Sequence, residues 1–229
     1  MLTPFPGADR VAPPGAVAWP YTTAEIAADA AVHAVGVLSA VVGVAALLTS
    51  ARHVSAVEFA ALAVYGAALV AALSLSAAYN LWPISAVKWW LRRFDHSAIF
   101  VLIAGTYTPF ITQMRDAPAA LGLLAWMWGV AAAGIALKVA LPGRYDRATI
   151  AVYVALSASG LACLGPFMEA LPASTLWLLV AGGVIYVTGI AFHLWEGLAY
   201  QNAIWHAFVL VAAATHYAAV LDCLVLQHA

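Results

Sequence analysis

The chain has 229 residues, of which 66% are hydrophobic and 8% are charged. A soluble domain carries about 25% charged residues, so this composition excludes a surface that faces water on all sides. We therefore interpret the chain as an integral membrane protein. Its net charge of −1 gives no electrostatic basis for a nucleic-acid partner. Two cysteines without metal-site spacing predict no disulfide scaffold.

Seven charge-free stretches divide the chain, each about as long as the roughly 20 residues that cross the hydrocarbon core. Lipid offers no hydrogen-bond partners to the backbone, so each spanning segment is expected to be a helix. The predicted fold is all-α: a polytopic bundle of seven transmembrane helices in one domain, residues 25–229, after a proline-rich flexible tail, residues 1–24. The stretches are 30–51, 59–87, 96–114, 117–137, 148–168, 170–195 and 197–221.

Lysine and arginine counts predict the orientation, because basic residues near helix ends favour the cytoplasmic side. Seven basic residues fall on the side of the N-terminal tail and two, Arg52 and Arg115, on the opposite side. We therefore expect a cytoplasmic N-terminus and an external C-terminus. The seven are Arg10, Lys88, Arg92, Arg93, Lys138, Arg144 and Arg147.

The first predicted helix, from about residue 25 to 48, begins with three polar residues. Glu25, Asp29 and His33 are four apart in turn, so they share one helix face. An acidic first turn that suits the helix dipole, together with one packed histidine, explains this pattern without a function. A functional site is the alternative, and both interpretations stay open for Glu25 and His33.

Two further polar pairs lie at helix ends. Ser76 and Asn80 are four residues apart in the last turns of the second predicted helix, residues 57–81. Asn202 and His206 have the same spacing at the start of the seventh, so each pair shares a face. His216 lies nearly three turns deeper than His206 and needs a partner that the sequence does not identify.

Asp95 opens the third predicted helix, directly before His96. A carboxylate at the mouth of a membrane helix is costly and therefore marks a candidate functional residue. A favourable interaction with the helix dipole is the simpler explanation. In the predicted topology, Asp95 enters the membrane on the side where Ser76 and Asn80 leave it and where Asn202 and His206 enter. We therefore expect these five residues to share one pocket.

In the later predicted helices, the sequence indicates how the helices pack and does not indicate further catalytic residues. Residues 148–167 are expected to form one continuous helix. In the sixth predicted helix, residues 174–194, the pair Gly182 and Gly183 and the later Gly189 predict close approach of a neighbouring helix.

At these residues the chain resembles the hemolysin III-type bacterial membrane proteins of the progestin and adipoQ receptor superfamily. The resemblance covers about residues 25–220. Its most specific parts are Arg93-Phe94-Asp95-His96, residues 103–110 (IAGTYTPF) and residues 203–210 (AIWHAFVL), followed by His216.

The resemblance implies a zinc site. In that family the second helix ends in Ser-x3-His and the seventh opens with His-x3-His, so that three histidines bind zinc and an aspartate of the third helix holds the metal-bound water. Here Ser76, Asp95 and His206 match, whereas Asn80 and Asn202 stand at the other two ligand positions. Zinc prefers imidazole, thiolate and carboxylate ligands, so we expect weak binding or none at these positions.

Another histidine could replace the missing ligands, and the sequence leaves open whether His33, His96 or His193 does so. His96 follows Asp95 by one position and so points about 100° away on a helix, which disfavours it.

The resemblance suggests functions of different classes. The favoured one is a non-catalytic protein of the plasma (inner) membrane that acts in membrane homeostasis or lipid sensing, with membrane lipid as its partner. The alternative is a ceramidase-like lipid-amide hydrolase, in which Asp95 acts on a metal-bound water. A metal-free version would use His206 as base, Asp95 to orient it and Ser76 as the nucleophile. The family name also implies a cytolysin or pore former, but no predicted helix has a sustained polar stripe.

Overall fold

The computed structural model describes residues 21–141, 145–195 and 197–226, and every regular element in these ranges is helical. Most of the predicted tail, residues 1–24, lies outside them, so its flexibility stays a prediction. The elements are α1 (Thr23–Ser50), α2 (Ala56–Leu81), α3 (Ala86–Ile111), α4 (Ala117–Ala140), α5 (Asp146–Ser157), the 3₁₀ helix η2 (Ala158–Cys163), α6 (Leu164–Ala170), α7 (Ala173–His193) and α8 (Gln201–Leu224).

Capping residues determine where the first helices begin. The Thr22 hydroxyl accepts from the backbone N–H of Glu25, and the Glu25 carboxylate accepts from the backbone N–H of Thr22. Ser55 and Glu58 form the same reciprocal capping box at the start of α2. Each box satisfies two backbone N–H groups that the helix leaves unpaired, which explains why α1 begins at Thr23 and α2 at Ala56.

Six of the helical runs are long and apolar enough to cross a membrane: α1, α2, α4, residues 148–170, α7 and α8. The remaining long helix, α3, has 26 residues and carries basic residues in its first two turns. The chain is thus an all-helical, polytopic membrane protein. The seventh crossing by α3 and the orientation of the N-terminus stay predictions.

The helix expected over residues 148–167 is interrupted, which corrects the prediction of one continuous helix. The hydroxyl of Tyr107, from α3, donates to the carbonyl of Ser157 and accepts from the backbone N–H of Gly160 at 3.2 Å. A side chain that enters the hydrogen-bond ladder in this way breaks a helix. The chain therefore passes from α5 through η2 to α6 within one membrane-length run.

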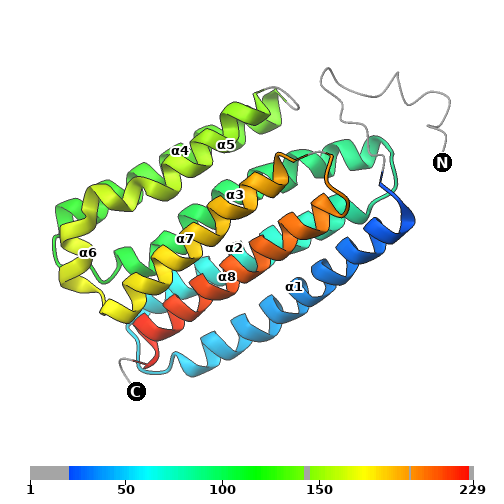
Figure 1. The fold of residues 1–229 in the computed structure, drawn as a ribbon. Coiled ribbons are helices and arrows are strands. Elements are labelled where there is room, and N and C mark those ends of the chain that lie inside the picture. The colour runs from blue at the N-terminus through cyan, green and yellow to red at the C-terminus, as the bar shows by residue number, and fades with distance from the viewer. Residues whose placement is uncertain (1–20, 142–144, 196, 227–229) are drawn as a thin grey trace.

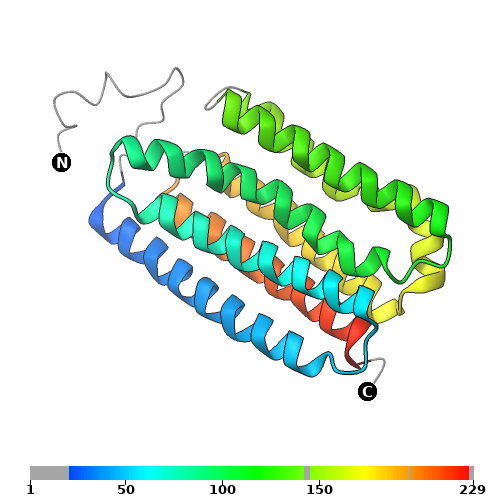
Figure 2. The same ribbon diagram turned by 180° about the vertical axis from the view of Figure 1, so that it is seen from behind.

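The helices lie side by side in a bundle (Figure 1). Helix α2 packs between α1 and α3, and α8 packs between α1 and α7. Helix α1 lies along one edge, and α4 and α5 lie along the opposite edge (Figures 1 and 2). This arrangement brings the start of α1, the end of α2 and the start of α8 together at one end of the bundle.

Glycines allow α7 and α8 to approach closely, as the sequence predicted. A Cβ atom on Gly182 would lie 2.3 Å from the ring of His216, and one on Gly189 would lie 2.8 Å from Phe208. Gly183 faces open space instead. His216 therefore packs on Gly182, and its Nε2 lies 3.2 Å from the carbonyl oxygen of Leu179. This contact provides the partner that the sequence left unidentified.

Candidate functional site

A buried contact near the start of α1 joins Asp29 to His206 of α8. Asp29 is 4% exposed and His206 is 8% exposed. Asp29 Oδ1 lies 2.6 Å from His206 Nδ1, although the two residues are 177 positions apart in the chain. A buried carboxylate requires such partners, so this contact holds α1 against α8.

Two asparagines extend this contact to α2. The Asn202 side chain donates to Asp29 Oδ2 at 2.8 Å and to Asn80 Oδ1 at 3.1 Å. The Asn80 Nδ2 donates to the carbonyl of Ser76 at 2.9 Å and lies 3.5 Å from His206 Nε2. Side chains of three helices thus form one hydrogen-bonded group. We call it the polar centre, and it consists of Asp29, His33, Ser76, Asn80, Asn202 and His206.

Two contacts fix the orientation of the His206 ring. Nδ1 lies 2.6 Å from Asp29 Oδ1 on α1. The opposite nitrogen, Nε2, lies 3.5 Å from the side-chain amide nitrogen of Asn80 on α2. The ring of His206 is therefore held between α1 and α2.

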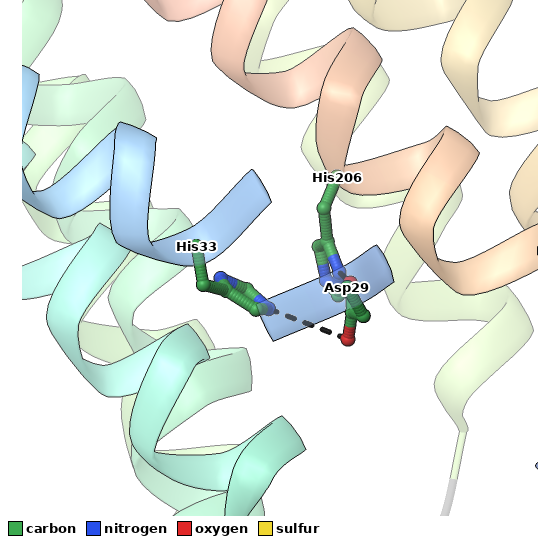
Figure 3. Close-up of side chains that lie close together, drawn as sticks. All are labelled: Asp29, His33 and His206. Atoms are coloured by element: carbon green, nitrogen blue, oxygen red, sulfur yellow. Dashed lines mark hydrogen bonds and ion pairs between the residues drawn. The ribbon is translucent and has the colours of Figure 1, made fainter. Parts of the chain in front are cut away.

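His33 completes the polar centre but is only loosely bonded. Its Nε2 lies 3.5 Å from Asp29 Oδ2, one helical turn away on α1, and this buried atom has no hydrogen-bond partner. Its ring lies beside that of His206, with the ring centroids 4.3 Å apart. Figure 3 shows the three side chains converging from α1 and α8. A buried nitrogen without a partner calls for a specific explanation.

Two small cavities flank the polar centre, each of about 20 Å³. The first is lined by His33, Ser76 and His206 together with apolar side chains of α1, α2 and α8. The second is lined by Glu25, Asp29, Asn80, Asn202 and neighbouring tyrosines. A site of this volume holds roughly one water molecule.

Glu25 fastens the end of α1 to the loop that precedes α8. Its Oε1 accepts from the backbone N–H of Tyr200 at 2.9 Å, while Oε2 serves the capping box with Thr22. Tyr200 has a left-handed backbone, with φ at 58°. The face shared by Glu25, Asp29 and His33 is thus directed at the beginning of α8.

The structure brings together most of the residues that the sequence singled out. Asn80, Asn202 and His206 are in contact, and Ser76 joins them through Asn80. Asp95 instead lies 3.4 Å from His96, and none of the contacts described for it reaches those four residues. A catalytic role for Asp95 or Ser76 stays a prediction.

A bundle of apolar helices with a buried polar centre at one end defines a polytopic membrane protein with an internal site. Residues 27–217 match the model of the family described as haemolysin-III related, and the chain belongs to this family.

The most informative relatives agree with this assignment. Hemolysin-3 of Bacillus cereus is 33% identical over 195 residues, which cover 85% of this chain and 89% of that protein. The Hemolysin-3 homolog of Bacillus subtilis (strain 168) is 30% identical over 202 residues, which cover 88% of this chain and 95% of that protein. The monocyte to macrophage differentiation factor of Homo sapiens is 28% identical over 165 residues, which cover 69% of this chain and 67% of that protein. The chain is thus a hemolysin III-type member of the progestin and adipoQ receptor superfamily.

The ligand set that the resemblance implies does not suit zinc in this chain. Asn80, Asn202 and His206 offer one imidazole and two neutral amides, and the amides already hydrogen-bond to one another. Zinc sites are built from imidazole, thiolate and carboxylate groups. A different trio has that chemistry: Asp29, His33 and His206 each present one ligand atom, and these atoms lie within 4.8 Å of one another.

Proposed function

We propose that the chain is a non-hydrolytic membrane protein that acts in membrane homeostasis by sensing membrane lipid. The observation that carries this proposal is the contact between Asn80 and Asn202, at the two positions where the resemblance implies zinc-binding histidines. Amides bonded to one another link helices and supply poor zinc ligands. We therefore derive no chemical step through a metal at those positions.

The second cavity holds only about one water molecule, so a lipid head group would contact it at its edge, where Glu25 is partly exposed. Its lining combines the carboxylates of Glu25 and Asp29 with the apolar side chain of Ile26 and the aromatic rings of Tyr21 and Tyr200. Small-molecule sites commonly combine apolar walls with a few polar groups in this way. A lipid head group that bonds to Glu25 would compete with the Glu25–Tyr200 contact that ties α1 to the loop before α8. Lipid binding would thereby weaken the contact between α1 and the loop that precedes α8.

The outer face of α1 supports the same proposal. Val35, Leu38 and Val42 lie on this face and are each more than half exposed. Apolar side chains exposed along a membrane-length helix are in contact with lipid. A change in the surrounding lipid therefore acts directly on the helix that carries Asp29 and His33.

A lipid-amide hydrolase is the second candidate, and the geometry of His206 favours it. Asp29 contacts the His206 ring at Nδ1, and Ser76 lines the same cavity as His206. A serine, a histidine and an orienting carboxylate are the parts of a nucleophilic centre. In that mechanism, Nε2 takes the Ser76 proton as Oγ attacks the amide carbonyl. The amine leaves with this proton, and water then releases the fatty acid from Ser76.

Two measurements on the purified protein separate these candidates. The first is mass-spectrometric detection of fatty acid released from a ceramide in vesicles. We expect no release above that of the Ser76→Ala variant. Release by the unmodified protein that Ser76→Ala abolishes would overturn the first proposal in favour of the second.

The second measurement is the melting temperature in detergent, with and without added phospholipid. A ligand that binds the folded state raises the melting temperature. We expect such a rise for the unmodified protein and a smaller one for Glu25→Gln. Glu58→Gln is the matched control, because it alters the capping box of α2 in the same way and lies outside the cavity. If phospholipid raised the melting temperatures of Glu25→Gln and Glu58→Gln equally, this result would contradict a lipid site at Glu25.

The cellular setting belongs to the same proposal. We place the chain in the plasma (inner) membrane with seven crossings, a cytoplasmic N-terminus and the polar centre near the cytoplasmic face. The seven basic residues on the side of the N-terminal tail, against two on the other, support this orientation. Reporter fusions at the C-terminus and in the loop before α3 test it. A cytoplasmic signal from the C-terminal fusion would refute the orientation.

A further inference from the structure

The buried Nε2 of His33 is the starting observation. This atom has no hydrogen-bond partner, although the Asp29 carboxylate lies 3.5 Å away and the His206 ring lies alongside. Burying a polar atom without a partner costs free energy, so a site that retains one is suited to a ligand that the nitrogen can bind. An imidazole nitrogen accepts either a hydrogen or a metal ion.

We propose that Asp29, His33 and His206 bind one divalent ion of the zinc class, which ties α1 to α8. This site differs from the one that the resemblance implies, because it shares only His206 with that ligand set. It also goes beyond the proposed function, which requires no metal. Two imidazoles and one carboxylate form a ligand set that zinc favours.

The spacing of the ligand atoms supports the proposal. Zinc lies about 2.0–2.2 Å from nitrogen and oxygen ligands, so neighbouring ligand atoms in a tetrahedral site are roughly 3.3–3.6 Å apart. His33 Nε2 and Asp29 Oδ2 are separated by 3.5 Å. All three residues present a ligand atom within 4.8 Å of the others, so small side-chain movements bring the trio around one ion.

The contacts around the trio support the same site. His206 Nδ1 and Asp29 Oδ1 face each other at 2.6 Å, so only a small separation of these two atoms is needed to place an ion between them. Asn202 donates to Asp29 Oδ2 at 2.8 Å, and Asn80 Nδ2 lies 3.5 Å from His206 Nε2. The two asparagines thus orient the carboxylate and the imidazole rather than supply ligands.

The first cavity leaves a position for a fourth ligand. It is lined by both His33 and His206, and its volume of about 20 Å³ admits roughly one water molecule. Three protein ligands and one exchangeable position form an open zinc site, in contrast to a closed structural one. A water molecule fits that position.

Zinc titration of the chelator-stripped, folded protein in detergent tests the proposal. We expect saturation at about one zinc ion per chain, measured by calorimetry, and a zinc-dependent rise in melting temperature. Failure of the folded, unmodified protein to bind zinc would overturn the proposal. This outcome does not depend on whether any variant folds.

The zinc affinities of single-residue variants show which side chains are ligands. Loss of a residue that hydrogen-bonds to a metal ligand lowers metal affinity about 10–100-fold. We therefore expect Asn202→Ala to lower the zinc affinity by a factor in that range. We expect His33→Gln, which removes a ligand, to lower the zinc affinity by a larger factor. His96→Gln is the matched control, because His96 belongs to the other aspartate–histidine pair and its Nδ1 is also buried without a hydrogen-bond partner. We expect this control to bind zinc as the unmodified protein does. Unchanged binding by folded His33→Gln, or loss of binding in His96→Gln, would overturn the assignment.

Discussion

Two of the aspartate–histidine pairs in the described part of the chain, Asp29 with His206 and Asp95 with His96, differ in how many helices they join. Asp95 and His96 are neighbours on α3, with their ionisable atoms 3.4 Å apart. Asp29 and His206 come from α1 and α8, and Asn202 and Asn80 extend their contact to α2. The side chain of Asp95 is 14% exposed, whereas that of Asp29 is 6% exposed. The pair that is remote in sequence is therefore the more buried and the more connected.

This difference shows how a site forms in a helical bundle. Consecutive residues on a helix diverge by about 100°, so Asp95 and His96 do not share a helix face and their contact stays within α3. Residues four apart share a face, and a third residue from a facing helix closes the site. Asp29 and His33 satisfy the first condition and His206 satisfies the second.

The largest expected effect comes from removing each aspartate in turn. Asp29→Ala deprives His206 and Asn202 of their acceptor, and breaking a buried polar pair from one side costs about 3 kcal/mol or more of unfolding free energy. Asp95→Ala removes a contact within one helix and should cost less than about 1 kcal/mol. Denaturant titration in detergent measures both. Equal losses would contradict the distinction between the two pairs.

The next prediction concerns the asparagines. In a His33→Gln background, Asn80→His together with Asn202→His should create a three-histidine set around His206. Neither change alone should suffice, because two imidazoles leave the set incomplete. Zinc at 100 times its dissociation constant should then stabilise the double variant by about 2.7 kcal/mol.

The zinc-dependent shift in melting temperature measures this gain, with the His33→Gln parent as the control. We expect a strongly non-additive gain, since the new ligands share one ion. A folded double variant that shows no zinc response would mean that the two positions do not converge closely enough on His206.

The smallest expected effect is that of His33→Gln in the absence of metal. Because His33 Nε2 makes no hydrogen bond, its loss should cost no more than about 1 kcal/mol. The cost should grow when zinc is present, since the variant then loses a ligand. Melting curves with and without chelator compare the two conditions. A large loss in chelator would mean that His33 is a structural residue, which would weaken its assignment as a ligand.

The sequence predicted α1 and α2 well because charged residues flank their apolar stretches. The charge-free stretches and the acids at Glu25 and Glu58 place α1 and α2 within two residues of their observed bounds. The start of the third helix was wrong: α3 begins at Ala86, capped by the Ser85 hydroxyl, so Asp95 lies nine residues inside the helix and does not open it. The break between α5 and α6 could not be predicted in this way. It depends on Tyr107, whose hydroxyl reaches Gly160 from 53 residues away in the chain.

The polar centre was predictable only in part. The spacing of four residues correctly put Asn80 beside Ser76 and Asn202 beside His206 on their helices, and it put Asp29 and His33 on one face. It carried no information on which helix that face meets. The sequence favoured Asp95 instead, because a carboxylate at the predicted mouth of a membrane helix is costly and because Asp95 matches the family pattern. Only the packing of α1 against α8 reveals Asp29 as the partner of His206.

A double-mutant cycle compares the two pairs most directly. Alanine substitutions at Asp29 and His206, singly and together, give their coupling free energy, and the same set at Asp95 and His96 provides the reference. Hydrogen bonds to charged groups contribute about 1.5–3 kcal/mol, so we expect a coupling in that range for Asp29 and His206. For Asp95 and His96 we expect less than about 0.5 kcal/mol. Equal couplings, or a larger one at Asp95 and His96, would contradict the placement of the polar centre at Asp29 and His206.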